Sequence, residues 1–445
     1  MSCWTGVSPL ASTRQRSSVG VGVGAILAAL LLSFQPCCRG SSGDRSWVFQ
    51  SCLQQCIASG CTLLPHLPVS EQQALGVHSC PAACARMRQA SPMPLSLRLF
   101  RWSCEDDCKY HCMEAVEGWK ARAAGGGLSS IHASSQHNQP QGQPQVLPVE
   151  KYYGKWPFRR VAGMQELLSV LASLANLAAH ALCLARLRAR VRTVVAAAHI
   201  TTAPAAPPTR ASGAGPQGPD GLLCRLPYPF LGLWTAYSVL HMNAWLWSAL
   251  FHCRDTRTTE RLDYCSAIAV VAAGLAAAVA RSLWGHTRRR RLAAVAAMLC
   301  IIVGLAAHLH YMLAVKFDYG WNMRVCVAAG VTTALLWLVW VWGVRHPARG
   351  RMTAFLLLAH AAMLLEVLDF APPVASGRLL DAHAAWHWAT VPLTALFYSW
   401  LEADADWCQA GRAAVAVGAG EAGARAGGAV GAAAGGVEAG KHKAV

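Results

Sequence analysis

The chain has 445 residues, of which 54% are hydrophobic and only 14% are charged. This composition excludes a single soluble globule of that length, because too few polar residues are available to cover its surface. A formal net charge of +17 would suit a nucleic-acid-binding protein, but long apolar stretches indicate instead that the basic residues mark the cytosolic side of a membrane protein. We therefore expect contact with membrane lipid and none with nucleic acid.

The first forty residues have the order of a secretory signal. Arg14 and Arg16 precede an apolar run over 19–34, and small residues follow at 40–43. This order is typical of a cleaved signal peptide, which we assign to 1–40. An uncleaved membrane anchor is the alternative, since the apolar run is long.

A cysteine-rich module is predicted next, over 41–122. Its eight cysteines are Cys52, Cys56, Cys61, Cys80, Cys84, Cys104, Cys108 and Cys112. In an exported segment this density predicts up to four disulfides, whose pairing the sequence leaves open. A zinc knuckle is the alternative, because three of the cysteines recur at every fourth position. A flexible Gly/Ser/Gln/Pro-rich linker follows over 123–150.

A membrane domain is predicted over 151–403, where seven apolar segments each approach the roughly twenty residues that a membrane-crossing helix needs. We place them at 162–185, 228–251, 262–283, 292–314, 324–343, 352–370 and 385–402. The expected fold is an all-α membrane protein, a bundle of seven transmembrane helices with an N-terminal lumenal disulfide-rich module. A low-complexity Ala/Gly-rich tail over 404–445 should lack regular structure.

The loops predict an orientation. Arginines cluster in alternate connections, at 186–192, 288–291 and 345–351. The positive-inside rule places these loops in the cytosol, so the N-terminus is expected in the lumen and the tail in the cytosol. Lys441 and Lys443 near the chain end match a dilysine retrieval signal, which predicts recognition by coat proteins and residence in the Golgi or endoplasmic reticulum membrane. Two lysines at a tail tip could also occur by chance.

Five polar side chains are expected to meet at the lumenal side of this bundle. Ser248 and His252 lie near the end of the second helix, Asp263 at the start of the third, and His383 and His387 at the start of the seventh. In a bundle of seven crossings these three helix ends share one membrane depth. Such side chains are costly there, so their convergence indicates a working site.

The residue types favour a hydrolytic metal centre. Histidines at i and i+4 can both reach one ion, and a third from another helix completes the three-ligand set of catalytic zinc, with a fourth position for water that can attack an ester or amide. His252, His383 and His387 would bind zinc, Asp263 would act as general base, and Ser248 would donate to the developing oxyanion. Iron is the competing metal, if Asp263 joins two histidines.

A structural interpretation of each residue remains open. Each histidine could be an interfacial residue, Asp263 could cap the third helix, and Ser248 could bond back to its own helix. Hydrogen bonding between helices is expected for six further polar residues, with Asp369 the candidate for supporting the metal ligands from behind. The six are Asn176, His180, His308, His310, Glu366 and Asp369. A neighbouring basic group could engage a phosphate or form a solvated loop; it consists of Arg254, Arg257 and Arg261.

Several longer motifs carry a family resemblance. They are Asp44-Arg45-Ser46 with Phe49-Gln50-Ser51-Cys52, Trp102-x-Cys104-x2-Asp107-Cys108-x-Tyr110-x-Cys112-Met113, Lys151-Tyr152-Tyr153-Gly154-Lys155-Trp156-Pro157-Phe158, Phe251-His252-x-Arg254-Asp255, Thr259-Glu260-Arg261-Leu262-Asp263-Tyr264, Phe317-Asp318-Tyr319-Gly320-x-Asn322, and Asp381-Ala382-His383-x2-Trp386-His387. From about residue 44 to 402 the chain resembles the post-GPI-attachment factor 3 family, lipid-remodelling enzymes of GPI-anchored proteins. That family is similar to a wider group of seven-helix hydrolases that includes alkaline ceramidases.

The resemblance implies a specific chemistry. The shared pattern of Ser-x3-His, a following Asp, and His-x3-His implies zinc ligation by His252, His383 and His387, and catalytic roles for Asp263 and Ser248. It implies hydrolysis of the sn-2 acyl ester of the GPI phosphatidylinositol, giving lyso-GPI, with GPI-anchored proteins as substrates. The alternatives are a seven-helix receptor or sensor with a structural metal, and an adaptor for GPI-anchored proteins.

Overall fold

The computed structural model describes residues 41–58, 94–125, 148–201, 228–283, 287–373 and 377–435. Those residues form helices joined by short connections, with two isolated β-bridges and no strand among them. The expected signal peptide, residues 126–147 of the linker, Cys61, Cys80, Cys84 and the two lysines near the chain end lie outside the described residues.

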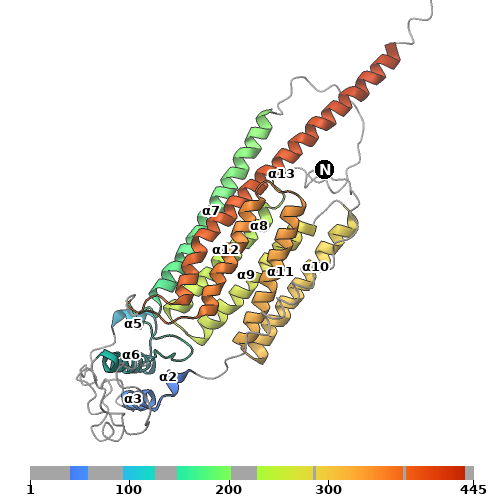
Figure 1. Cartoon of the computed structure of the whole chain (residues 1–445). Helices are drawn as coiled ribbons and strands as arrows, with labels where there is room; N and C mark the ends of the chain where they lie inside the picture. Colours follow the sequence, from blue (N-terminus) through green and yellow to red (C-terminus); the bar gives the residue numbers. More distant parts are fainter. Residues whose placement is uncertain are drawn as a thin grey trace, which may run out of the picture.

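Seven long helices run side by side (Figure 1). They are α7 (Leu167–Thr201), α8 (Leu231–Cys253), α9 (Arg257–Leu283), α10 (Arg288–His310, continued by the π-helical turn Tyr311–Val315), α11 (Tyr319–Gly343), α12 (Arg349–Leu368) and α13 (Ala382–Gly435). Each predicted apolar segment lies on one of them, in the predicted order.

The described helices include five that are long and apolar enough to cross a membrane, which identifies a multi-pass membrane protein. These five are α7, α9, α10 with its π-helical turn, α11 and α12. The other two, α8 and α13, carry polar residues of the site described below. α7 packs against both of them.

Helix ends differ from the predicted ones for local reasons. α7 begins at Leu167 rather than at 162, because Val161 and Met164 pair in a β-bridge. α9 begins five residues before the predicted start, since Thr256 Oγ1 accepts a hydrogen bond from the Thr259 amide at 3.2 Å. Asp263 therefore lies in the second turn of α9 and does not cap it.

The expectation of an irregular tail is wrong for its described part. α13 continues as helix to Gly435, well past the predicted end at 402. Alanine has the highest helix propensity of all residues, and alanines are frequent in this stretch, which accounts for the continuation despite the glycines between them.

The cysteine-rich module lies at one end of the bundle (Figure 1) and consists of α2 (Ser42–Arg45), α3 (Trp47–Ala58), α5 (Leu95–Leu99) and α6 (Cys104–Gly125). Disulfides Cys52–Cys112 and Cys56–Cys108 join α3 to α6. Cys104 is disulfide-bonded as well. The prediction of disulfides is confirmed for these cysteines, and the alternative of a zinc knuckle at the three cysteines of α6 is wrong.

Candidate metal centre

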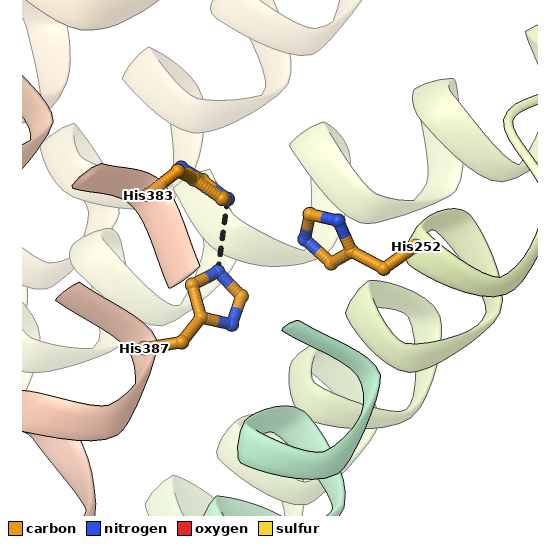
Figure 2. Close-up of side chains that lie close together, drawn as sticks. All are labelled: His252, His383 and His387. Carbon is orange, nitrogen blue, oxygen red and sulfur yellow. Dashed lines mark hydrogen bonds between the residues drawn. The ribbon is translucent and has the colours of Figure 1, made fainter. Parts of the chain in front are cut away.

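Three histidines converge at the end of the bundle that faces the module. His252 lies in the last turn of α8, and His383 and His387 lie in the first two turns of α13. Figure 2 shows the ring of His252 directed at the other two rings across the gap between the helices. One nitrogen from each ring can be chosen so that all lie within 4.8 Å of one another. The three form a group that could hold a metal ion.

The outer nitrogens of the rings are fixed from behind. His252 Nδ1 donates to Glu166 Oε2 at 2.6 Å, and His383 Nδ1 donates to Glu366 Oε2 at 2.6 Å. Because a carboxylate only accepts hydrogen bonds, Nδ1 carries the proton in both rings and Nε2 offers a lone pair. A carboxylate behind a histidine that presents its other nitrogen is the arrangement found around protein-bound metals.

The inner nitrogens fit a cation. His252 Nε2 is buried and finds no hydrogen-bond partner among the described residues. His383 Nε2 and His387 Nε2 lie 2.9 Å apart. Zinc–nitrogen bonds of about 2.0–2.1 Å would place two ligand nitrogens about 3.4 Å apart in a tetrahedral site, so small side-chain shifts suffice to bind an ion. A buried nitrogen without a proton donor would otherwise be costly, and a bound ion removes that cost.

Glu166 is itself held by the segment that precedes α7, which we call the strap (residues 150–166). Lys155 Nζ lies 2.5 Å from Glu166 Oε1 and 3.3 Å from Asp255. Burial opposes ionisation of Glu166, but the charge of Lys155 and the hydrogen bond from His252 outweigh it and hold the pKa of Glu166 well below its usual range. The Glu166 amide also donates to the carbonyl of His252 at 3.0 Å. The strap thus fixes both the backbone and the ring of this histidine.

The two remaining predicted residues lie beside the histidines. Ser248 Oγ shares a hydrogen bond of 3.0 Å with Ser173 Oγ of α7, and Ser173 Oγ is 3.1 Å from His387 Nδ1. Ser248 is therefore bonded across to a neighbouring helix. Asp263 lies in the second turn of α9, near His383 and Lys155 of the strap. The five residues come from three helices, as helix counting predicted.

Sequence reasoning missed three residues around the centre: Lys155, Glu166 and Ser173. A signal existed for Glu166, because it is the only acidic residue within the predicted first span, 162–185. The support proposed for Asp369 is instead provided by Glu366, one turn earlier. Asp369 turns toward the strap, where it binds Lys151 and accepts from Trp156 Nε1 at 3.0 Å.

Asn176 and His308 form hydrogen bonds between helices, as expected. Asn176 Nδ2 donates to the carbonyl of His387 at 2.9 Å, and His308 Nε2 lies 3.0 Å from Asn322 Oδ1. Arg254 belongs neither to a solvated loop nor to an open phosphate site, because it forms an ion pair with Asp106 of the module at 2.7 Å.

Comparison with known proteins agrees with this architecture. A sequence model of the Per1-like family matches residues 94–405. This range includes α5, α6, the strap and the histidine centre.

Individual relatives extend the similarity over most of the chain. Post-GPI attachment to proteins factor 3 of Drosophila melanogaster is 32% identical over 393 residues, which cover 88% of this chain and 95% of the relative. GPI-specific phospholipase A2-like PGAP3 of Danio rerio is 32% identical over 85% of this chain and 94% of its own. Protein PER1 homolog of Schizosaccharomyces pombe is 31% identical over 81% of this chain and 86% of its own. No solved structure matches the chain.

Proposed function

Because this chain belongs to the Per1-like family, we propose that it remodels the lipid of GPI-anchored proteins as a metal-dependent hydrolase. Relatives carry the name GPI-specific phospholipase A2-like, which points to cleavage of the sn-2 acyl ester. The reaction consumes water and yields a free fatty acid and a lyso-GPI that remains attached to its protein.

The observation that carries this proposal is the buried Nε2 of His252. It faces two further histidines, and carboxylates behind two of the three rings fix the nitrogen that each presents. A receptor could also contain a structural metal, but a structural zinc site is closed by four protein ligands. Three ligands with an aspartate and a serine beside them favour catalysis.

The metal is proposed to be zinc, held by His252, His383 and His387. When bound, zinc supplies Lewis acidity and makes water nucleophilic near neutral pH. Asp263 takes the proton of the attacking water and passes it toward the leaving alcohol. Ser248 donates a hydrogen bond to the oxyanion that develops on the ester carbonyl, and Ser173 orients both Ser248 and His387.

The surroundings of the site follow from the topology. With α8 and α13 added to the five apolar helices, the chain would cross the membrane seven times. The arginine-rich connections then lie on the cytosolic face, and the histidine centre with its module lies on the lumenal face. Lys441 and Lys443 would allow retrieval by coat proteins, in keeping with residence in the Golgi or endoplasmic reticulum.

Complementation tests the activity. Cells that lack the protein would be supplied with Asp263→Asn, His383→Ala or the wild type, and their GPI lipids would be analysed by mass spectrometry. We expect both variants to leave the original sn-2 chain in place while reaching wild-type levels in the membrane. Asp406→Asn and His308→Ala, which alter the same residue types away from the centre, should restore remodelling. Full restoration by both site variants would contradict the hydrolase and favour a receptor or an adaptor.

A further inference from the structure

Oppositely charged side chains join the cysteine-rich module to the bundle. Three acidic residues of α6, which we call the acidic row, are Asp106, Asp107 and Glu114. Each forms an ion pair with an arginine outside the module: Asp106 with Arg254 at 2.7 Å, Asp107 with Arg160, and Glu114 with Arg378. The three arginines come from three separate segments of the bundle end.

Each of these segments carries a residue of the metal centre. Arg254 follows His252 by two residues, Arg160 lies in the strap six residues before Glu166, and Arg378 precedes His383 by five. Each arginine that the acidic row binds therefore lies within six residues, along the chain, of a proposed ligand or of the carboxylate that orients one.

Aromatic rings strengthen two of the contacts. The guanidinium of Arg254 lies 4.1 Å from the ring centre of Trp102, and that of Arg160 lies 4.7 Å from the same ring. The guanidinium of Arg160 also lies 4.2 Å from the ring centre of Tyr110. Guanidinium groups covered by rings are partly removed from water, so their attraction to a carboxylate is screened less by salt.

The backbones also approach closely at this junction. Trp102 Nε1 donates to the carbonyl of Gly163 in the strap at 2.8 Å. A Cβ on Gly163 would lie 2.8 Å from the carbonyl oxygen of Ser96, and Gly163 has a φ of +84°, so only glycine suits this position. The module therefore packs directly against the strap.

α6 is a long helix held by disulfides, whereas the strap and the connection before α13, which it contacts, are largely non-helical. Two disulfides tie α6 to α3. Arg378, by contrast, lies in the non-helical connection before α13 with a φ of 59°, and most of the strap is non-helical. Backbone hydrogen bonds link the strap to the end of α8 and to Arg378, and the three ion pairs add side-chain contacts from α6 to all three segments.

We propose that the acidic row of α6 is a positioning element of the metal centre. It holds the end of α8, the strap and the start of α13 at the separation that lets the three histidines share one ion. The inference rests on the proposed function, and it assigns the module a role in metal binding rather than in substrate capture. Without the row, the histidines should remain present but bind metal weakly.

A charge exchange tests the inference on the purified full-length chain. Zinc affinity would be measured by competition with a chelator for Asp106→Arg, for Arg254→Asp and for the double variant. Each single variant should lose about 10- to 100-fold in zinc affinity, as expected when a residue that orients metal ligands is lost. The double variant, which exchanges the two charges, should recover most of the loss.

Glu105→Arg provides the matched control. Glu105 lies one position before Asp106 on α6, pairs with Lys109 within the same helix, and is exposed. The Glu105→Arg variant should bind zinc with the affinity of the wild type. Intact Cys52–Cys112 and a single-species elution profile would show that each variant is folded.

The possible results separate the explanations. Single variants that bind zinc normally would overturn the inference, and so would a double variant that fails to recover. In the latter case Asp106 and Arg254 affect zinc binding separately and not through their ion pair. A wild type that binds no divalent metal contradicts the proposed function itself, together with this inference, before any variant is compared.

Discussion

His252 and Glu166 lie 86 residues apart in the chain, yet His252 Nδ1 and Glu166 Oε2 are separated by 2.6 Å in the buried end of the bundle. This hydrogen bond decides which nitrogen of His252 faces His383 and His387. Glu366 does the same for His383, at the same distance. Two carboxylates, one in the strap and one on α12, therefore orient the rings of His252 and His383.

Glu166→Gln and Glu366→Gln should each weaken zinc binding by about 10- to 100-fold, because a neutral amide accepts from Nδ1 less strongly than a carboxylate and raises the basicity of Nε2 less. Chelator competition on the purified variants measures this. Glu402→Gln on α13 is the control and should behave as the wild type. Unchanged affinity in both site variants would mean that the carboxylates merely satisfy buried imidazoles.

Ser248→Ala should lower kcat by about 100- to 1000-fold, the usual effect of losing one oxyanion donor, with zinc content and KM close to the wild type. The measurement is acyl-ester hydrolysis of a GPI lipid in detergent micelles. Ser238→Ala removes another buried serine of the same helix, whose hydroxyl donates to the Trp234 carbonyl, and should keep its activity. A Ser248→Ala enzyme with full kcat would limit this serine to packing.

Much of the site was predictable from the sequence, since alternation of helices fixes which ends share a face and the i, i+4 spacing fixes which histidines share a side. That argument places His252, His383 and His387 at the same end of the bundle. It could not locate Glu166, because the strap approaches α8 through non-helical turns whose path no periodicity encodes. The contact of Ser173 with the site could not be predicted for another reason. The sequence does not indicate which of several serines in an apolar helix faces the neighbouring helices.

The helix ends show the same limit. Thr256 caps α9 and Asp381 Oδ1 accepts from the Ala384 amide at 2.8 Å to cap α13, whereas hydrophobicity alone placed both starts several residues later. Disulfide pairing was likewise beyond the sequence, because it depends on how α3 lies against α6.

A buried ion pair at the opposite end of the bundle should support stability. Arg281 Nη2 lies 2.6 Å from Asp404 Oδ1, and both side chains are almost wholly buried. Arg281→Met should cost about 3–5 kcal/mol, because it leaves Asp404 charged without its main partner in a low-dielectric core. Thermal unfolding in micelles measures the effect.

The matched control for that pair is Arg190→Met. Arg190 and Asp406 form an ion pair of 2.6 Å on the surface, with side chains 48% and 40% exposed. Solvent screens such a pair, so its loss should cost at most about 1 kcal/mol. Equal destabilisation by the two variants would show that burial of Arg281 and Asp404 does not determine their contribution.

The metal content of the purified protein tests the central claim most directly. Elemental analysis of the full-length wild type should find about one zinc per chain, and His252→Ala, His383→Ala and His387→Ala should each lose it, whereas His308→Ala should keep it. A wild type without zinc, or histidine variants that retain it, would contradict a centre formed by these three side chains.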